Sequence, residues 1–353
     1  MHTLNRFVPT IHELQPDCGD AMLGHSNKAF TVTMETFESL TSYWVSREDL
    51  LKWDCLFVLP PWLKVWWDSF GGGAKPYLCS IRCGNELLGI APLTLQGGKA
   101  ILMGSPDVCD YLDFIVAPGK ESEFLLLLVE HLKQQGISHL DLGPVRSDSA
   151  VITELIPIAK GLGYEFYCGQ EDVSFELELP ATWEEFLSAL TGKERHEIRR
   201  KLRRLDNAAS TQLRVVEDIR EVRSEIDTFL RLFTSSRSEK AAFLTAKRAA
   251  FFHSLAEAMA SLKILKLFFL DLDGKPAAAA LCFDYHSTVY LYNSGYDPQL
   301  RPLSVGLLDK VLSIRESIQR GRKKYDFLKG AEEYKYRLGG KPIPLYRCQV
   351  ELR

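Results

Sequence analysis

The chain has 353 residues, of which 46% are hydrophobic and 25% charged, and its formal net charge is -3. This length suits two domains, and the composition is typical of an ordinary globular protein rather than a disordered one. A charge this close to neutral excludes a whole-surface nucleic-acid binder, so any contact with a polyanion must come from a local basic cluster.

The N-terminal region predicts neither a signal peptide nor a membrane anchor. Residues 1–29 show no clear periodicity and are expected to form an irregular leader. No apolar run approaches the roughly 20 residues needed to span a bilayer, so we expect a cytoplasmic protein. Cys79 and Cys83 lie close together without a second pair at zinc-site spacing, which predicts reduced thiols and no metal site.

Residues 30–182 predict a first domain. Its expected elements, in order, are a strand at 30–34, helices at 37–44 and 62–70, a hairpin of strands at 76–82 and 87–95, strands at 100–103 and 111–116, a helix at 121–135, a strand at 139–142, a helix at 152–161 and a pair of strands within 164–179. Trp62, Trp66 and Trp67 are interpreted as a helical core face.

A basic linker helix, or helix pair, is expected at 183–210, before a second domain at 211–353. That domain should contain a strand at 213–216, helices at 219–233 and 246–261, a hairpin of strands at 262–272 and 275–285, a strand at 287–294, a helix at 303–320 and strands at 324–328 and 345–352. This order repeats that of the first domain, so the sequence predicts two similar domains in tandem.

The turn Arg301-Pro302-Leu303-Ser304-Val305-Gly306 carries the first functional signal. It lies where a predicted strand gives way to a helix, and such a helix start offers unpaired N–H groups and a positive dipole end. Pro302 suits a first helical turn because its missing N–H would be unpaired there. The sequence therefore predicts a phosphate-bearing ligand, the alternative being a helix start with nothing bound.

Several motifs together carry a family resemblance. The segments 271–280 (DLDGKPAAAA), 296–298, 301–306, 325–330 and 333–337 resemble the CelD-like acetyltransferases of the GNAT acyl-CoA N-acyltransferase superfamily, which are associated with bacterial cellulose or exopolysaccharide synthesis. The resemblance covers about residues 30 to 352. It implies an α/β fold of the mixed α+β kind, with tandem GNAT-like domains that each have a mixed, mostly antiparallel sheet flanked by helices. The architecture is also similar to that of Fem-type peptidoglycan aminoacyltransferases, which use aminoacyl-tRNA.

The resemblance implies a site for acetyl-CoA or another acyl-CoA as co-substrate, and no metal. In the superfamily this turn holds the CoA diphosphate, although Ser304 here replaces its first glycine. The preceding strand splays from the strand at 324–328 and exposes backbone groups to the pantetheine arm. The implied acyl-CoA residues are Tyr292, Asn293, Arg301, Ser304, Val305 and Gly306.

Acyl transfer needs a proton acceptor, donors that face the oxyanion, and an acid for the thiolate. Asp326, Glu332 and Glu333 are candidate bases, and Tyr334 is a candidate acid. Lys335 and Arg337 resemble a basic motif of the Fem-type enzymes that is thought to stabilise the transferring carbonyl. The alternatives are a salt bridge for the aspartate, a packing role for the tyrosine and a solvated basic pair.

Two further groups are candidates for binding the acceptor. Lys193, Arg195 and Arg199 belong to the basic helix, whose alternative is a solvated face. Asp110, Tyr111 and Asp113 come from the first domain, which has no equivalent of the 301–306 turn and is expected to help bind the acceptor.

The sequence thus predicts transfer of an acyl group, acetyl in the first instance, from CoA to an amine or hydroxyl of a sugar-like or amino-acid-like acceptor. An association with envelope synthesis machinery is expected, and no DNA partner. One alternative is aminoacyl transfer from aminoacyl-tRNA to a cell-wall precursor, the only hypothesis with a tRNA partner. Another is a non-catalytic GNAT-like scaffold in a polysaccharide synthase assembly.

Overall fold

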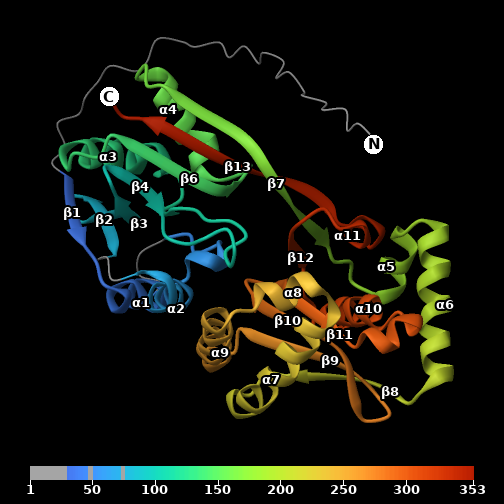
Figure 1. Cartoon of the computed structure of the whole chain (residues 1–353). Coiled ribbons are helices and arrows are strands. Elements are labelled where there is room, and N and C mark those ends of the chain that lie inside the picture. Colours follow the sequence, from blue (N-terminus) through green and yellow to red (C-terminus); the bar gives the residue numbers. More distant parts are fainter. Residues whose placement is uncertain (1–29, 47–50, 73–75) are drawn as a thin grey trace, which may run out of the picture.

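The computed structural model describes residues 30–46, 51–72 and 76–353, so the expected leader at 1–29 lies outside the described residues. The N-terminal lobe contains β1 (Phe30–Met34), α1 (Phe37–Ser46), α2 (Pro60–Phe70), β2 (Tyr77–Cys83), β3 (Glu86–Gln96), β4 (Lys99–Leu102), β5 (Ile115–Val116), α3 (Glu121–Gln134), β6 (His139–Arg146) and α4 (Ile156–Gly161). The C-terminal lobe contains α5 (Trp183–Ala189), α6 (Gly192–Ala208), β8 (Thr211–Val216), α7 (Ile219–Ser236), α8 (Ser238–Phe243), α9 (Ala246–Ser261), β9 (Leu265–Leu272), β10 (Lys275–Tyr285), β11 (Thr288–Tyr296), α10 (Val305–Gln319), β12 (Lys324–Lys329) and α11 (Glu333–Arg337). The strands β7 (Phe166–Glu178) and β13 (Lys341–Glu351) connect the two lobes (Figure 1).

All these strands belong to one sheet, with β5 attached to the side of β3. The strand order is β1-β2-β3-β4-β6-β13-β7-β12-β11-β10-β9-β8. The pairs β4–β6 and β11–β12 are parallel, and the other described pairs are antiparallel. The predicted fold class, a mixed and mostly antiparallel sheet flanked by helices, is confirmed.

The connection between the lobes differs from the sequence prediction. Residues 164–179 were expected to hold two strands, but β7 is a single strand of 13 residues. Its polar middle, around Gly169 to Asp172, resembles a turn in the sequence. These residues stay extended because β13, far away in the chain, pairs with β7 along almost its whole length and with β6 on its other side. The C-terminal strand therefore completes the sheet of the N-terminal lobe.

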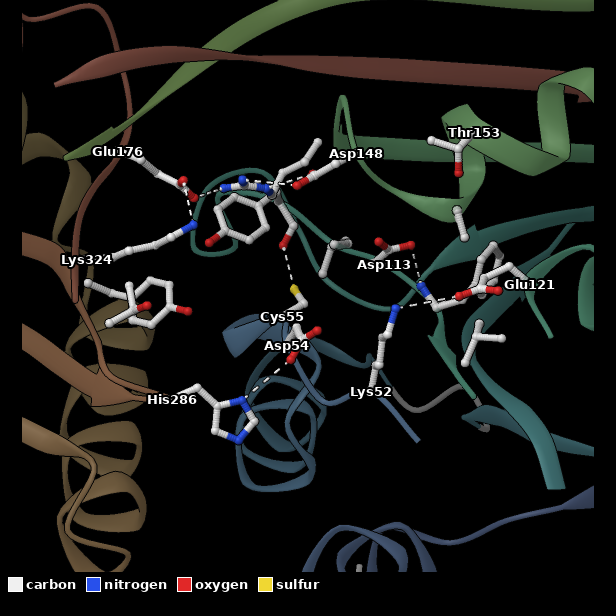
Figure 2. A pocket seen from close by; sticks show the side chains of 18 of the residues that line it. Lys52, Asp54, Cys55, Asp113, Glu121, Asp148, Thr153, Glu176, His286 and Lys324 are labelled. Carbon is white, nitrogen blue, oxygen red and sulfur yellow. Dashed lines mark hydrogen bonds and ion pairs between the residues drawn. The ribbon is translucent and has the colours of Figure 1, made fainter. Parts of the chain in front are cut away.

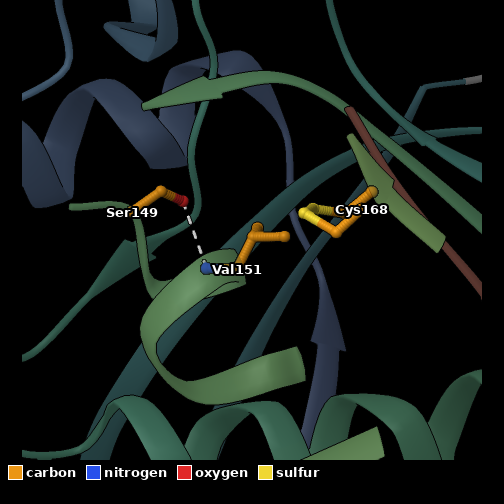
Figure 3. The surroundings of a disulfide bond; sticks show 4 residues. Ser149, Val151 and Cys168 are labelled. Atoms are coloured by element: carbon orange, nitrogen blue, oxygen red, sulfur yellow. Dashed lines mark hydrogen bonds between the residues drawn. A yellow bond between two sulfur atoms is a disulfide. The ribbon is translucent and has the colours of Figure 1, made fainter. Parts of the chain in front are cut away.

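Two cysteines on these long strands form a disulfide (Figure 3). Cys168 and Cys348 are directly opposite each other in the β7–β13 ladder, with their Cα atoms 4.1 Å apart. The prediction of reduced thiols is wrong for this pair, because a separation of 180 residues leaves no spacing signal in the sequence. The described cysteines Cys55, Cys79, Cys83, Cys109 and Cys282 are free.

No described helix is both long and apolar enough to cross a bilayer.

In the C-terminal lobe, helices cover both faces of the sheet. Alternate side chains of a strand point to opposite faces, so Phe269 and Leu281 share a core with α7 and α9. Their neighbours Phe268 and Ala280 pack with α10 on the other face. The helices α5 and α6 contact α10 and form the outer layer. The lobe is therefore a helix–sheet–helix sandwich whose strands are hydrophobic on both faces.

The two lobes share one hydrophobic core at Trp62 of α2. This side chain is fully buried, and its ring makes edge-to-face contacts with Phe251, Phe283 and Tyr292 of the C-terminal lobe. Such aromatic pairs add about 0.5–1.5 kcal/mol each beyond the burial of area. The predicted core face of this helix is confirmed for Trp62 and Trp66, which are buried.

Asp309 of α10 is a buried carboxylate beneath the sheet. Its exposed fraction is 0%, and neither carboxylate oxygen has a hydrogen-bond partner among the described residues. Burial raises the pKa of Asp309 to about 7, although the neighbouring Lys310 opposes the rise. The folded state therefore holds a proton that the unfolded chain releases at a pKa of about 3.9, and stability falls as the pH rises between these two values.

We expect Asp309→Asn to stabilise the protein selectively at high pH. Asn has nearly the same shape but cannot ionise, and each pH unit between the two pKa values corresponds to about 1.4 kcal/mol. The gain in free energy of unfolding should thus be about 2–3 kcal/mol larger at about pH 8 than at about pH 5, measured by urea titration. Asp206→Asn, at an exposed position of α6, is the control. An equal effect of Asp309→Asn at both pH values would contradict the assignment.

Candidate functional site

The site lies where the parallel strands β11 and β12 separate. They pair at only three positions, from Thr288 opposite Lys324 to Tyr290 opposite Asp326. Beyond this point β11 stays paired with β10 through a bulge at Tyr292, and β12 stays paired with β7 through a bulge at Phe327. The two strands thus open a gap between their C-terminal ends, as the sequence analysis expected.

Asp326 stabilises the bulge by which β12 turns away from β11. One carboxylate oxygen accepts hydrogen bonds from the Leu328 amide at 2.7 Å and from the Ser174 hydroxyl at 3.2 Å. The other accepts from the Tyr111 hydroxyl at 2.9 Å. Burial raises the pKa of Asp326 to about 6, and its side chain is completely buried. This predicted base lines none of the cavities described below, so its contacts are those of a positioning residue.

The left-handed backbone at Leu328 is stabilised by a second buried charge. Leu328 has φ +58, a conformation that costs an L-residue roughly 1–2 kcal/mol. Lys335 of α11 donates to the Leu328 carbonyl at 2.9 Å and to the Lys329 carbonyl at 2.6 Å, and it pairs with Glu332 at 2.9 Å. Its three N–H donors are therefore occupied, and they satisfy carbonyls at the end of the diverging strand.

The first cavity, here called the turn cavity, has a volume of about 340 Å³ and lies at the N-terminal end of α10. Five basic side chains, those of Lys201, Arg237, Lys240, Arg301 and Lys310, line it together with a single carboxylate, that of Glu332. Amides in the first turn of a helix have no carbonyl partner within that helix, and they add to the positive potential. The cavity is therefore suited to a group with several negative charges.

The turn that bounds this cavity has the geometry that a glycine would give it. Ser304 has φ +60 and ψ +28, the left-handed conformation that glycine adopts most readily, and its amide donates to the Arg301 carbonyl at 2.9 Å. At Gly306 a Cβ atom would lie 2.7 Å from the Tyr296 ring. The serine thus preserves the shape of the turn, and Gly306 lets the helix start pack against β11.

The second cavity, the strand cavity, occupies the gap between β11 and β12 and has a volume of about 390 Å³. Its walls include residues 291–294 of β11 and 327–329 of β12. Four residues, Lys240, Ser294, Glu332 and Tyr334, line both this cavity and the turn cavity. The two cavities are therefore adjacent, and together they are called the path from the helix start to the opening between the strands.

The structure brings the six predicted acyl-CoA residues together along this path. Tyr292 and Asn293 line the strand cavity. Arg301, Ser304, Val305 and Gly306 line the turn cavity. All the acyl-CoA residues that the sequence analysis predicted, in the 301–306 turn and in the preceding strand, therefore line the path.

The predicted catalytic residues separate into two groups. Tyr334 lines both cavities, and Lys335 lines the strand cavity. Glu333 is exposed and forms an ion pair with Arg337 on the surface of α11, and neither lines a cavity. Glu332, the third candidate base and the residue before this helix, lines both cavities.

The predicted basic face of α6 does not line the path. Lys193 and Arg199 are exposed, and Arg195 donates to the Ser188 carbonyl. Lys201, two residues beyond Arg199, points into the turn cavity instead. The helical period decides this outcome, since only one side of the helix can face the cavity.

The three acceptor candidates of the N-terminal lobe line two different cavities. Asp110 lines the strand cavity and accepts a hydrogen bond from the Lys329 amide at 2.9 Å. Tyr111 and Asp113 line a third cavity of about 780 Å³ between the lobes (Figure 2). Residues 111–113 are not part of a strand, contrary to expectation, because the strand is limited to Ile115 and Val116.

This third cavity, the interlobe cavity, shares no lining residue with the other two. Arg146 lies beside the Tyr111 ring, 3.9 Å from Asp326, and is paired with Glu176 and Asp148. Burial raises the pKa of Asp113 to about 7. The lining holds six carboxylates and four Lys or Arg cations, so its charge balance is opposite to that of the turn cavity.

Lys240 is a residue of the path that the sequence analysis missed. It lies on α8, a helix of six residues that was not predicted, and its ammonium group donates to the Ser294 carbonyl of β11. Burial lowers the pKa of Lys240 to about 7, and repulsion from Lys310 and Arg237 acts in the same direction. A lone lysine in an apparent loop gives no signal of this in a single sequence.

Comparisons with known proteins agree with this architecture. Residues 192–336 match the family model of the acetyltransferase (GNAT) domain, a stretch that contains every lining residue of the turn cavity. No curated protein matches the chain in a sequence comparison. The region that is similar to a GNAT domain therefore lies in the C-terminal lobe and covers less than half of the chain.

Solved structures extend the similarity to both lobes. FemX aligns with a TM-score of 0.63 at 13% identity, over 90% of this chain and 96% of its own. A conserved protein of unknown function from Bacteroides thetaiotaomicron aligns with a TM-score of 0.54 at 12% identity, over 92% and 100%. L-PGS from Bacillus licheniformis aligns with a TM-score of 0.50 at 11% identity, over 82% and 90%. At such identities the similarity shows the fold alone.

Gly295 provides a test of how α7 is fixed against β11. A Cβ atom at this position would lie 2.2 Å from the backbone nitrogen of Phe233. We expect Gly295→Ala to lower the free energy of unfolding by about 3 kcal/mol, since the backbone of α7 would have to move. Gly161→Ala, where no atom lies within 4 Å, is the matched control. Equal stability of the two variants in urea titrations would contradict this packing.

Proposed function

We propose that the chain transfers an acyl group, acetyl in the first instance, from acyl-CoA to an amine or hydroxyl of a sugar-like or amino-acid-like acceptor. The observation that carries this proposal is the pair of adjacent cavities that extends from a helix start rich in basic side chains to a gap between two strands. A GNAT domain match over residues 192–336 supports it. The CelD-like resemblance favours an acceptor from exopolysaccharide or envelope synthesis.

The turn cavity is the proposed site of the CoA phosphates. First-turn amides of α10 and the guanidinium of Arg301 would bind the diphosphate, and Lys201 and Arg237 lie on the same cavity wall. The excess of basic over acidic side chains in the lining favours this donor over a neutral one. The pantetheine arm would then follow β11 past Ser294 into the strand cavity.

The strand cavity is the proposed place of the reaction. Tyr334 lies where the two cavities meet, and burial raises the pKa of its hydroxyl above the ordinary value. The hydroxyl therefore stays protonated and can donate to the departing thiolate. Asp110 is the predicted acceptor residue that lies on this path, which makes it the proposed contact for the attacking group.

Two alternatives share this fold. The alignment with FemX keeps the hypothesis of an aminoacyl-tRNA donor, although at 13% identity it does not choose between donors. A non-catalytic scaffold was suggested by the replacement of glycine with Ser304, but the serine adopts the conformation that the glycine would have. The local concentration of cations in one small cavity favours a compact donor such as acyl-CoA.

Calorimetry with acetyl-CoA tests the donor directly. The wild-type protein should bind it with one site per chain, and Arg301→Ala should weaken binding about 10- to 100-fold, the effect of losing one charge-assisted hydrogen bond. Arg231→Ala removes an exposed arginine of α7 that lines neither cavity of the path and should bind like the wild type. Absence of binding to the wild type would exclude the acyl-CoA donor.

A further inference from the structure

We propose that Lys240 is the base that accepts the proton of the attacking amine or hydroxyl during acyl transfer. This inference rests on the proposed function and names the residue that completes its chemistry. Neither the GNAT match nor the family motifs point to this position, which lies on a short helix between α7 and α9.

The first argument is the position of the Lys240 side chain. Lys240 lines both cavities and therefore lies at their junction. The thioester of a bound acyl-CoA would pass there from the 301–306 turn to the gap between β11 and β12. The Ser294 carbonyl, four residues beyond the last pair of β11 with β12 at Tyr290, accepts one of the N–H bonds of Lys240. This bond holds the amine through one N–H, so a neutral Lys240 still has a lone pair available.

The second argument is the charge around this amine. Lys310 of α10 and Arg237 before α8 repel its proton, and Glu332 before α11 attracts it. Burial is the largest effect, and together these groups lower the pKa of Lys240 to about 7. A base works best when its pKa lies near the operating pH. The lowered pKa therefore makes the neutral form of Lys240 accessible near neutral pH.

The third argument is that the other basic groups on the path are occupied, apart from the exposed Glu239, which lines the strand cavity alone. Glu332 is paired with Lys335 at 2.9 Å, and Asp110 accepts the Lys329 amide. Lys310 donates to the Gly306 carbonyl at 2.8 Å, at the foot of the turn cavity. Asp326 lines neither cavity. Lys240 is the group that combines access to both cavities with a lowered pKa.

The proposed step is balanced as follows. The nitrogen or oxygen of the acceptor attacks the thioester carbon, so that a new N–C or O–C bond forms while the C–S bond breaks. The proton of the attacking atom passes to the neutral Nζ of Lys240. The Tyr334 hydroxyl donates a hydrogen bond to the departing thiolate, which then takes the proton from the Lys240 ammonium. The enzyme returns to its starting state with no net gain of protons.

The protonation of Lys240 is measured by its reaction with trace acetic anhydride over a range of pH, followed by mass spectrometry of the peptide that contains it. The expected midpoint of its reactivity is near pH 7, far below the ordinary lysine value of about 10.4. Saturating CoA should protect the residue if the cavity binds it. A midpoint at the ordinary lysine value would overturn the inference.

The catalytic role is tested with Lys240→Arg, which keeps the positive charge but cannot accept a proton near neutral pH. Thiol release from acetyl-CoA is followed with D-glucosamine and with hydroxylamine as acceptors. Wild-type turnover should rise with pH and level off above about pH 7, whereas the variant should lose roughly 10²-fold or more in kcat. Its dissociation constant for acetyl-CoA, from calorimetry, should be unchanged. Lys247→Arg, at an exposed position of α9 that lines neither cavity, should behave like the wild type.

The outcomes separate this inference from the proposed function. If the wild type does not bind acetyl-CoA, the proposed function fails. If acetyl-CoA binds and Lys240→Arg turns over at the wild-type rate, the function stands and the role of Lys240 fails. If acetyl-CoA binds but neither amine is accepted, the labelling midpoint decides: a value near pH 7 supports the assignment, and an ordinary value rejects it.

Discussion

The gap between β11 and β12 depends on one buried carboxylate. Asp326 accepts the Leu328 amide within its own strand and thereby holds the bulge that turns β12 away from β11. Burying a carboxylate is unfavourable, and here three hydrogen bonds offset the cost. Two of the donors, Tyr111 and Ser174, come from the N-terminal lobe and from β7. The shape of the site in the C-terminal lobe is thus set by groups from outside it.

This dependence gives the N-terminal lobe a role although it has no phosphate-binding turn of its own. It supplies Tyr111 to the anchor and Asp110 to the strand cavity, and its Trp62 packs against the sheet face that carries Tyr292. The long pairing of β13 with β7 holds the lobes together. Lys335 stabilises the end of the diverging strand, because it donates hydrogen bonds to the carbonyls of Leu328 and Lys329. The C-terminal lobe, which carries the match to the GNAT family model, and the N-terminal lobe therefore form one structural unit.

Local features of this molecule could be predicted from the sequence, and distant pairings could not. The 301–306 turn and its flanking strand and helix depend on neighbouring residues, so their positions and their lining role agreed with expectation. β7 is one uninterrupted strand, and Cys168 bonds to Cys348, because the partner strand β13 lies about 180 residues further along the chain. Lys240 acquires its lowered pKa from burial and from Lys310 and Arg237, which become neighbours only in the folded chain.

The difference between local features and distant contacts also explains why Asp110 and Asp113 line different cavities. Residues so close in sequence were assigned to one acceptor site, but the loop that carries them passes over Asp326 and places them in different cavities. Asp326 itself looked like a candidate base because a carboxylate within a strand is unusual. Its three donors, which lie on three separate segments, make it an anchor instead. A sequence shows the presence of a buried charge more readily than its partners.

A crystal structure of the protein with bound CoA would test the central claim most directly. The account predicts the diphosphate at the amides of Val305 and Gly306, beside Arg301, and the pantetheine arm along β11 with its sulfur next to Lys240 and Tyr334. CoA bound in the interlobe cavity, or across the exposed face of α6, would contradict it.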